Sequence, residues 1–303
     1  MIYCFDIGGS AIKGAVAVSP TDIRPLPKVA TPLDDFTAFA EAIAGVIATQ
    51  SLPADAGVAI SITGVVDPDT ALIKCANIPC IDGRNLAADL GAYLNRHVLV
   101  ANDADCFALA EAVAGAGRGH RIVFGAILGT GVGGGLIIDG KLINGAGGFA
   151  GEWGHGPVAA TMAGTPPVAI PRFPCGCGQV GCVDTVGAAR GMERLHKHLH
   201  GLDLPSTAIV AAWLAGNGQA ERTVDCFVDL VASPLALVLN VVGASIVPVG
   251  GGLANAPELI ERLDAAVRSR TLRHADKAIV VPGQCTLEPG LIGAGILGLT
   301  ELA

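Results

Sequence analysis

The pattern of apolar and glycine-rich positions repeats once along the chain. Ile2 to Ile7 predicts a buried strand, and Ile12 to Val18 predicts a second strand that returns beside it after a short turn. Ile122 to Leu128 predicts another buried strand, with a glycine-rich turn and a return at Leu136 to Ile138. Because the two copies lie about 120 residues apart, the pattern favours two related domains that each contribute one turn to a shared cleft.

Segments of helical spacing alternate with short apolar runs over the rest of the chain, which is typical of an α/β fold. Helices are expected over residues 36–49, 105–114, 187–200, 207–214, 222–242, 256–271 and 290–299. Strands are expected over 57–62 and 97–101, and an irregular segment rich in glycine and proline over 144–174. Residues 230–257 carry no charge but include prolines, so we expect a buried helix and strand there and not a membrane span.

The glycine-rich segment Gly115 to Gly119 is the best candidate for a hinge between domains. We expect a small domain made of residues 1–118 and 290–303, which carries the first turn. A larger domain is expected over 119–289, which carries the second turn. Each domain is long enough to bury its own core.

The composition argues for a folded protein and against a nucleic-acid partner. Hydrophobic residues make up 51% of the chain and charged residues 15%, below the usual share of about 25%. The formal net charge is −8, whereas nucleic-acid binders normally present a basic surface. The first residues lack the basic leader of a signal peptide, and nine cysteines without an export signal are typical of a reducing compartment. We therefore expect a cytoplasmic globular protein with no membrane partner.

Two glycine-rich turns carry the first candidate chemistry. The first is Gly8-Gly9-Ser10, and the second runs from Gly129 and Thr130 to Gly135. The second formally matches a dinucleotide-binding fingerprint, but a strand follows where that motif requires a helix, and neither turn ends as a P-loop does. The backbone N–H groups of such turns can bind phosphate. Glycines that merely permit tight hairpins are the alternative, and the presence of two matching turns favours phosphate binding.

Asp6 indicates a cation beside the first turn. A carboxylate next to bound phosphate would repel it unless a cation lies between the two groups. Mg²⁺ loses its bound waters reluctantly, so we expect Asp6 to contact Mg²⁺ through water.

Asn102 and Asp103 follow the expected strand at 97–101, where the chain enters a helix. Both residue types are preferred helix N-caps, so capping is one interpretation. Only one of them is needed as a cap, and a carboxylate at a helix N-terminus stays ionised. Asp103 could then accept the proton of a substrate hydroxyl during phosphoryl transfer, in which orienting that hydroxyl matters more than strong basicity. The two interpretations stay open on local grounds.

Three cysteines in one glycine-rich loop, Cys175, Cys177 and Cys182, predict a structural zinc site. His155 is the nearest candidate for the fourth ligand. Such a site would hold the proline-rich segment 161–174 and so orient Glu152. The remaining six cysteines lie in apolar surroundings and are expected to be small core residues. His196, His198 and His200 are expected at a solvated helix end.

Five segments resemble, in this order, the signatures of the ROK family of bacterial sugar kinases and repressors. They are Asp6 to Ser10, Asn102 to Ala104, Leu128 to Gly135, Glu152 to His155, and Cys175 to Cys182. The likeness extends from residue 6 to the end of the chain. It is closest, through Ala76 to Pro79 and Asn102 to Leu109, to members that phosphorylate N-acetylglucosamine.

The resemblance implies a two-domain actin-like ATPase/hexokinase (ribonuclease H-like) fold, a cleft between the domains, and an enzyme that often forms homodimers. It implies that Asp103 is the base for the sugar 6-hydroxyl and that the sugar is bound by Gly64, Asn77, Asn102, Glu152, His155 and Asp184. It implies that ATP is bound by Asp6, Gly8, Gly9, Ser10, Ala11, Gly129, Thr130, Gly131, Val132, Gly133, Gly134, Gly251 and Gly252. His155 would also serve zinc.

Two positions depart from the family pattern. The family usually has Thr-Lys where this chain has Ser10-Ala11, so the hydroxyl is kept and the lysine is lost. Lys13 lies on the same face of the expected strand as position 11 and is the nearest candidate to replace that lysine. The family's glutamate two residues after the last cysteine, which contacts the sugar near positions 1 and 2, is Asp184 here.

The expected activity is ATP-dependent phosphorylation of N-acetylglucosamine to its 6-phosphate. Glucokinase, fructokinase and N-acetylmannosamine kinase activities are alternatives within the family. A sugar-responsive sensor or repressor is the alternative from another class. A repressor needs an N-terminal helix-turn-helix, for which little chain precedes Gly8.

Overall fold

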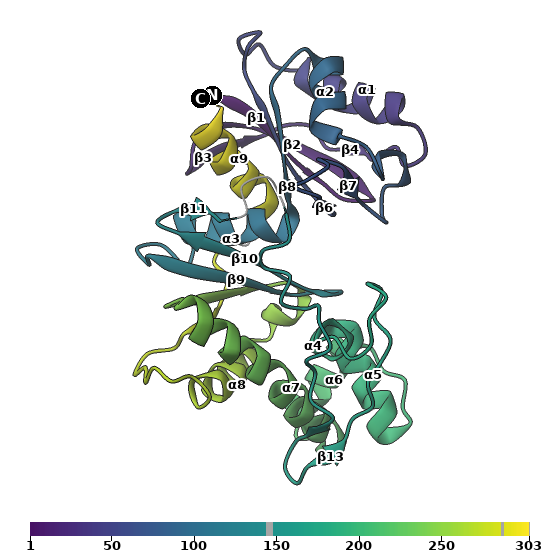
Figure 1. Ribbon diagram of the computed structural model, residues 1–303, viewed down its shortest axis with the longest axis vertical. Coiled ribbons are helices and arrows are strands. Elements are labelled where there is room, and N and C mark those ends of the chain that lie inside the picture. The colour runs from purple at the N-terminus through teal and green to yellow at the C-terminus, as the bar shows by residue number, and fades with distance from the viewer. Residues whose placement is uncertain (144–147, 286–287, 303) are drawn as a thin grey trace. The chain divides into compact units, whose positions relative to one another are not determined.

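The computed structural model describes residues 1–143, 148–285 and 288–302. The chain forms two compact units (Figure 1). Unit 1 comprises residues 1–119, 135–150 and 285–303, and unit 2 comprises residues 120–134 and 151–284. The sequence predicts residues 135–150 in the larger domain, whereas they group with unit 1. The reason is a close approach to helix α3 (Asp103–Ala114), since a Cβ at Gly135 would lie 2.8 Å from the Cβ of Ala108.

The sheet of unit 1 is built on the first apolar run of the chain. β1 (Ile2–Ile7) pairs antiparallel with β2 (Ala11–Ser19) and parallel with β5 (Val58–Ile62). The strand order is β3-β2-β1-β5-β8, with β4 also paired to β2. The remaining bounds are β3 Asp22–Pro25, β4 Val29–Ala30 and β8 Val98–Asn102. β8 runs parallel to β5, so the ends of β1, β5 and β8 meet at one edge.

Helices cover both faces of this sheet. Alternate residues of β1, such as Tyr3 and Phe5, join one core cluster with apolar residues of α1 (Phe36–Ile47) and α2 (Leu86–Leu94). α9 (Pro289–Glu301) packs on β1, β2 and β5, and against α3. Small residues permit this approach, because a Cβ at Gly295 would lie 3.1 Å from the Cβ of Ala17. The small elements of unit 1 are β6 Val65–Val66, β7 Ile73–Lys74 and the 3-10 helix η1 Pro79–Ile81.

The second sheet has the order β11-β10-β9-β14-β15. β9 (Ile122–Leu128) pairs parallel with β14 (Val247–Gly250), which in turn pairs parallel with β15 (Val280–Pro282). β10 (Val132–Ile138) follows the second glycine turn and passes from unit 2 into unit 1, where it pairs with β11 (Lys141–Leu142).

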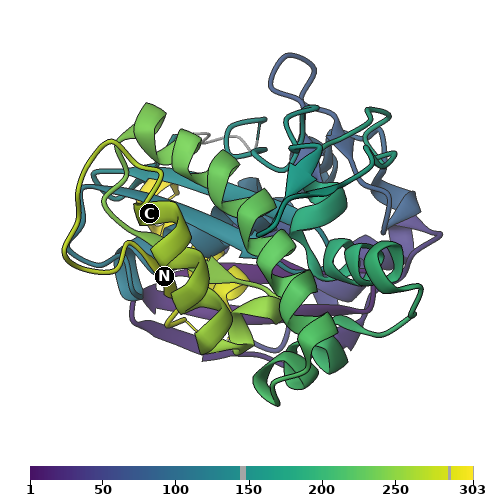
Figure 2. The same cartoon turned by 90° about the horizontal axis from the view of Figure 1, so that it is seen from below.

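The helices of unit 2 gather around α7 (Gly218–Val242). α7 contacts α5 (Ala189–His200), α6 (Ser206–Leu214) and α8 (Pro257–Arg268), and Figure 2 shows α7 and α8 side by side. Among the described residues, α7 alone is long and apolar enough to cross a membrane, yet 56% of its apolar window is buried within the protein. It ends at Gly243 in the left-handed conformation, and strand β14 follows, as expected for a buried helix and strand.

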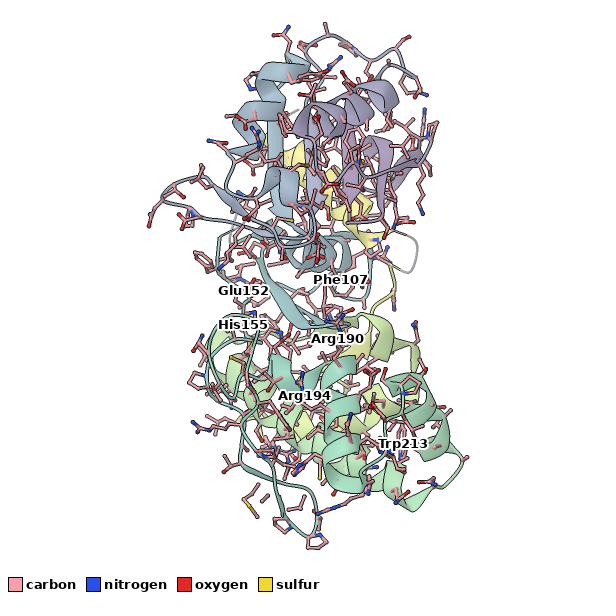
Figure 3. All side chains as sticks on the ribbon, turned by 90° about the vertical axis from the view of Figure 1, so that its right-hand side faces the viewer. Phe107, Glu152, His155, Arg190, Arg194 and Trp213 are labelled. Atoms are coloured by element: carbon pink, nitrogen blue, oxygen red, sulfur yellow. The ribbon has the colours of Figure 1, made fainter. Side chains whose placement is uncertain are left out.

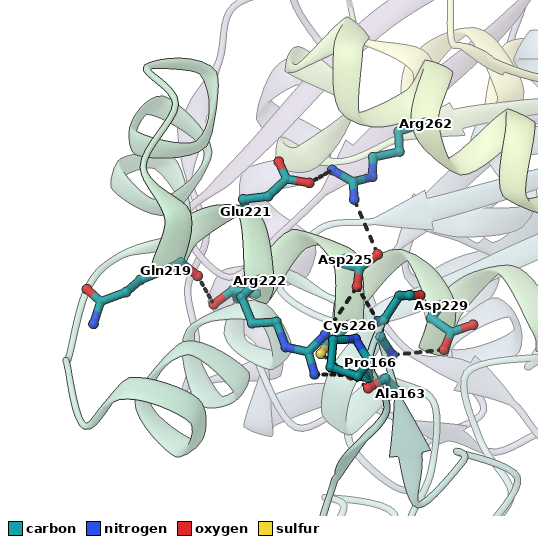
Figure 4. Close-up of polar contacts among 12 residues, drawn as sticks. Ala163, Pro166, Gln219, Glu221, Arg222, Asp225, Cys226, Asp229 and Arg262 are labelled. Carbon is teal, nitrogen blue, oxygen red and sulfur yellow. Dashed lines mark hydrogen bonds and ion pairs between the residues drawn. The ribbon is translucent and has the colours of Figure 1, made fainter.

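Charged residues on the first half of α7 hold the segment that leads to the cysteine loop (Figure 4). The backbone N–H of Gly164 donates to Asp229 Oδ2 at 3.0 Å, and that of Thr165 donates to Asp225 Oδ2 at 2.7 Å. Arg222 donates to the Pro166 carbonyl. These contacts hold the loop between β12 (Met162–Ala163) and β13 (Val168–Ala169), so α7, and not the cysteine cluster alone, fixes the proline-rich segment.

Several expected elements differ from the structure. The expected helix over 187–200 begins two residues late, as α5 at Ala189, because the chain is extended at Ala188. A separate short helix, α4 (Asp184–Gly187), precedes it. The segment 144–174 contains the hairpin of β12 and β13, while residues 144–147 lie outside the described residues. His196 was wrongly expected in solvent: it is 2% exposed, and its Nδ1 lies 2.8 Å from Thr223 Oγ1 on α7.

Glu111 on α3 is a buried carboxylate that holds two connecting segments of unit 1. Its side chain accepts the backbone N–H of Ala116 at 2.8 Å and that of Cys285 at 2.7 Å, and the residue is 0% exposed. Replacing it by leucine keeps the volume but leaves both N–H groups without this acceptor. We expect Glu111→Leu to lower the free energy of unfolding by on the order of 3 kcal/mol, measured by denaturant titration. The matched control, Glu41→Leu on the exposed face of α1, should change it by less than about 0.5 kcal/mol.

Candidate active site

The first glycine turn closes the hairpin of β1 and β2 in unit 1. The Gly8 N–H donates to the Ala11 carbonyl at 3.1 Å, and the Thr31 hydroxyl donates to the Gly8 carbonyl at 2.7 Å. The Gly8 N–H is thus engaged inside the turn, while the Ser10 side chain is exposed. A Cβ at Gly9 would lie 3.1 Å from the Asn77 carbonyl oxygen, so the turn and the Asn77 loop are in contact.

Asp6 and Lys13 lie opposite one another on β1 and β2 beside this turn. Asp6 Oδ1 accepts from the Ser61 hydroxyl at 3.1 Å, and Asp6 Oδ2 lies 3.5 Å from Lys13 Nζ. Lys13 Nζ also lies 2.5 Å from Glu288 Oε2. Burial raises the pKa of Asp6, and the nearby Lys13 ammonium opposes that shift. The hydrogen bond to Glu288 is the largest cause that raises the pKa of Lys13.

Asn102 and Asp103 lie at the edge of the same sheet, where β8 passes into α3. Asn102 is the N-cap: its Oδ1 accepts the Ala104 N–H at 2.8 Å, and its Nδ2 donates to the Gly64 carbonyl at 2.8 Å. Asp103 is the first residue of α3 and is half-buried. Gly64 has φ +145°, and a Cβ there would lie 2.8 Å from the Lys74 carbonyl oxygen, so only glycine fits. Capping is therefore assigned to Asn102 and not to Asp103.

The second glycine turn joins β9 and β10, and its closing hydrogen bond spans one residue fewer than that of the first turn. The Gly129 N–H donates to the Gly131 carbonyl at 3.1 Å, and the Thr130 side chain is exposed. Gly251, with φ +88°, follows β14 and precedes the 3-10 helix η2 (Gly252–Asn255). A Cβ at Gly251 would lie 2.5 Å from the Leu128 carbonyl carbon, so the Gly251 backbone lies directly against the start of the turn.

The structure brings the three predicted cysteines of unit 2 together with His155. Their ligand atoms all lie within 4.8 Å of one another. Cys177 Sγ and Cys182 Sγ are 3.7 Å apart, and Cys175 Sγ is 3.6 Å from His155 Nδ1. A tetrahedral zinc ion with Zn–S bonds of about 2.3 Å requires sulfurs about 3.8 Å apart, so the four residues fit this ion. The pKa of the exposed Cys177 thiol is lowered to about 7, chiefly by the backbone N–H of Gln179, which favours a thiolate ligand.

Glu152 lies next to His155 (Figure 3). Its Oε2 is 3.7 Å from His155 Nε2, while His155 Nδ1 faces the cysteines. At 3.7 Å this is a close polar contact and not a hydrogen bond. Burial raises the pKa of Glu152, and the neighbouring Asp184 raises it further, whereas His155 lowers it.

Each unit thus gathers one part of the predicted site. Unit 1 holds Asp6, Gly8, Gly9, Ser10, Ala11, Gly64, Asn77, Asn102 and Asp103, and unit 2 holds the remaining predicted residues. Sequence reasoning missed Ser61 and Glu288, which contact Asp6 and Lys13. Ser61 is a single polar residue within an apolar strand, and that signal could have identified it. Glu288 gave no local signal.

Comparisons with known proteins identify the family of this chain. The ROK family model matches residues 2–301. The chain is 37% identical to the N-acetyl-D-glucosamine kinase of Escherichia coli O157:H7, over 99% of this chain and 100% of that protein. It is 36% identical to N-acetylgalactosamine kinase AgaK of Shewanella sp. ANA-3, over 98% of this chain and 96% of that protein.

The fold agrees with a solved structure as well. The ROK family glucokinase of Streptomyces griseus, in complex with glucose and AMPPNP, superposes with a TM-score of 0.74 at 29% identity, covering 98% of each chain. The expected actin-like ATPase fold is thereby confirmed. The chain belongs to the ROK family, as the match of its family model over nearly the whole length shows.

Proposed function

We propose that this protein transfers the γ-phosphoryl group of ATP to the 6-hydroxyl of N-acetyl-D-glucosamine. The observation that carries the proposal is the full-length identity of 37% with a protein named N-acetyl-D-glucosamine kinase. The geometry supports it, because Asn102 occupies the cap of α3 and Asp103 follows as a half-buried carboxylate at the same sheet edge as the first glycine turn.

Asp103 is proposed to receive the proton of the sugar 6-hydroxyl as that oxygen attacks the γ-phosphorus. The bond from phosphorus to the β,γ-bridging oxygen breaks, and ADP leaves with that oxygen. The transition state is loose, so Asp103 acts mainly by orienting the hydroxyl. The N-terminus of α3 favours its ionised form. Asn102 supports this position by holding both Ala104 and Gly64.

Four of the predicted residues are proposed to contact the sugar. Gly64 and Asn77 would line its pocket in unit 1, and Glu152 and His155 would accept and donate hydrogen bonds to sugar hydroxyls in unit 2. The zinc ligands would be His155, Cys175, Cys177 and Cys182. Zinc would supply rigidity here, since four protein ligands fill a structural site and leave no position for substrate.

ATP is proposed to bind through the backbone of the two turns, with the Ser10 and Thr130 hydroxyls as further donors, and its adenosine to lie by Gly251 and Gly252. Mg²⁺ would bind near Asp6 through water and neutralise phosphate charge. Lys13 already places one positive charge next to Asp6. We propose that Lys13 replaces the lysine that the family usually has at position 11.

Lys13→Ala is expected to raise the KM for ATP by about tenfold, because a charged hydrogen bond to phosphate is worth roughly 1.5–3 kcal/mol. The KM for the sugar should change little. The double variant Ala11→Lys, Lys13→Ala restores a lysine on the same strand face and should recover most of the loss. Steady-state kinetics with each substrate varied separately measure these effects. An unchanged KM for ATP in Lys13→Ala would remove this role. Lys74→Ala, at the exposed residue of β7, serves as the control and should not change the KM for ATP.

N-acetylgalactosamine is the second candidate substrate, because the relative named N-acetylgalactosamine kinase is 36% identical. The two sugars differ only in the configuration at C4. A coupled assay of ADP release with N-acetylglucosamine, N-acetylgalactosamine, N-acetylmannosamine, glucose and fructose decides between them. We expect the highest kcat/KM for N-acetylglucosamine. No ADP release above the ATPase background with any of these sugars would contradict the proposed function.

We also propose that the protein is a cytoplasmic homodimer. All nine cysteines are free thiols in the structure, which agrees with a reducing compartment. Leu237 and Val241 on α7 are 60% and 75% exposed, and Leu272 is 88% exposed. Exposed apolar side chains of this size are suited to an interface between subunits. Light scattering coupled to size-exclusion chromatography should give a mass near 60 kDa, about twice the 30.3 kDa of one chain.

A further inference from the structure

The side chain of Asp184 contacts the second glycine turn. Its Oδ1 accepts the backbone N–H of Val132 at 2.7 Å. A Cβ at Gly131 would lie 2.7 Å from the same oxygen, so the turn is in close contact with the carboxylate. Asp184 is itself held in place, as the first residue of α4, by its own N–H, which donates to the Gly154 carbonyl at 2.8 Å.

The other oxygen of Asp184 faces the cysteine cluster. Its Oδ2 lies 3.8 Å from Cys175 Sγ, and Cys182 is two residues away in sequence. Each oxygen of the carboxylate therefore has a neighbour within unit 2, the turn on one side and the metal ligands on the other. This arrangement differs from the sugar contact that the family resemblance implies for this position.

Two more contacts attach the same turn to the segment that carries the cluster. Trp153 Nε1 donates to the Gly133 carbonyl at 2.7 Å. The backbone N–H of Ala189, at the start of α5, donates to the Gly129 carbonyl at 2.9 Å. The turn is thus held at Gly129, Val132 and Gly133 by residues that flank the four metal ligands in sequence.

We infer that Asp184 is a positioning residue that holds the second glycine turn in the conformation that binds ATP, and that it couples this turn to the zinc site. The inference rests on the proposed kinase function, in which this turn binds the phosphates of ATP. The carboxylate accepts the Val132 N–H, so that N–H points toward Asp184 and the peptide plane at this position is fixed. Neighbouring N–H groups are then held in one direction before nucleotide arrives, which lowers the entropic cost of binding phosphate.

The test measures nucleotide affinity directly by calorimetry, with AMPPNP and no sugar, for wild type, Asp184→Ala and Asp184→Asn. We expect Asp184→Ala to raise the Kd by tenfold or more, since the Val132 N–H loses its acceptor. Asp184→Asn keeps an Oδ1 acceptor of the same length, so the Kd should stay within threefold of wild type. Asp203→Ala, an exposed aspartate of unit 2 paired with Lys197, is the matched control and should not change the Kd.

Kinetics and metal removal complete the test. Asp184→Ala should raise the KM for ATP in proportion to the Kd for AMPPNP, while the KM for the sugar should stay within threefold of wild type. Removal of zinc from wild type should weaken AMPPNP binding by about the same factor as Asp184→Ala does. A rise confined to the sugar KM would overturn the positioning role, and unchanged AMPPNP affinity after zinc removal would overturn the coupling. If wild type itself binds no AMPPNP, the proposed function fails. If wild type and Asp184→Ala bind it equally well, only this inference fails.

Discussion

Asp103→Asn is expected to reduce kcat by about 10³-fold, because a positioned base typically contributes 10²–10⁴-fold to a proton transfer. The asparagine has the same shape and lies at the same first position of α3, but it cannot accept the proton of the 6-hydroxyl. N-acetylglucosamine binding, measured by calorimetry, should stay within a few-fold of wild type. The combination of lost turnover and kept binding separates a catalytic role from a structural one.

The control for this variant lies on a neighbouring helix of the same unit. Asp89 occupies the first turn of α2, as Asp103 does in α3. Both substitutions remove a carboxylate from a helix N-terminus, and each should cost about 0.3–1 kcal/mol of stability. Asp89→Asn should keep full kcat. Turnover by Asp103→Asn within tenfold of wild type would show that another group accepts the proton.

Loss of the metal site is the second large expected effect. Elemental analysis of the purified protein should find one zinc ion per chain. Cys182→Ser, which changes the buried cysteine of the cluster, should abolish zinc binding. Structural zinc sites contribute about 10–16 kcal/mol to folding in zinc-finger peptides, because the unfolded chain rarely holds a preformed site. We therefore expect Cys182→Ser to lower the thermal midpoint substantially and to make residues 151–184 sensitive to protease.

A second cysteine variant controls for the loss of a thiol alone. Cys80 lies in unit 1, outside the cysteine cluster, packed against the core of that unit, with its Sγ 3.5 Å from the Pro32 carbonyl oxygen. Cys80→Ser should keep one zinc per chain and a near-normal midpoint. Absence of stoichiometric zinc from wild type, prepared without chelator, would contradict the metal site.

Local sequence signals sufficed for the parts of the fold that continuous apolar runs define. β1 spans Ile2–Ile7 as expected, and α3 differs only in starting two residues earlier than expected, at Asp103, directly after its N-cap Asn102. The cysteine cluster was also predictable, because Cys175, Cys177 and Cys182 belong to one short loop whose glycines allow the thiols to meet. In each case the determining residues are close together in the chain.

Contacts between distant segments were not predictable. β10 begins at Val132 and not at Leu136, since pairing with β9 overrides the low strand propensity of Gly133 to Gly135. The hydrogen bond from Val132 to Asp184 joins residues 52 positions apart, and a carboxylate after the last cysteine gives no sign of it. The salt bridge of Lys13 with Glu288 spans almost the whole chain.

The identity of the phosphorylated atom tests the central claim most directly. Incubation of the protein with MgATP and N-acetylglucosamine, followed by a phosphorus–proton correlation spectrum of the product, shows which sugar protons couple to phosphorus. We expect coupling to the two protons on C6, as transfer to the hydroxyl oriented by Asp103 requires. Coupling to the anomeric proton, or an absence of any phosphorylated sugar, would contradict this account.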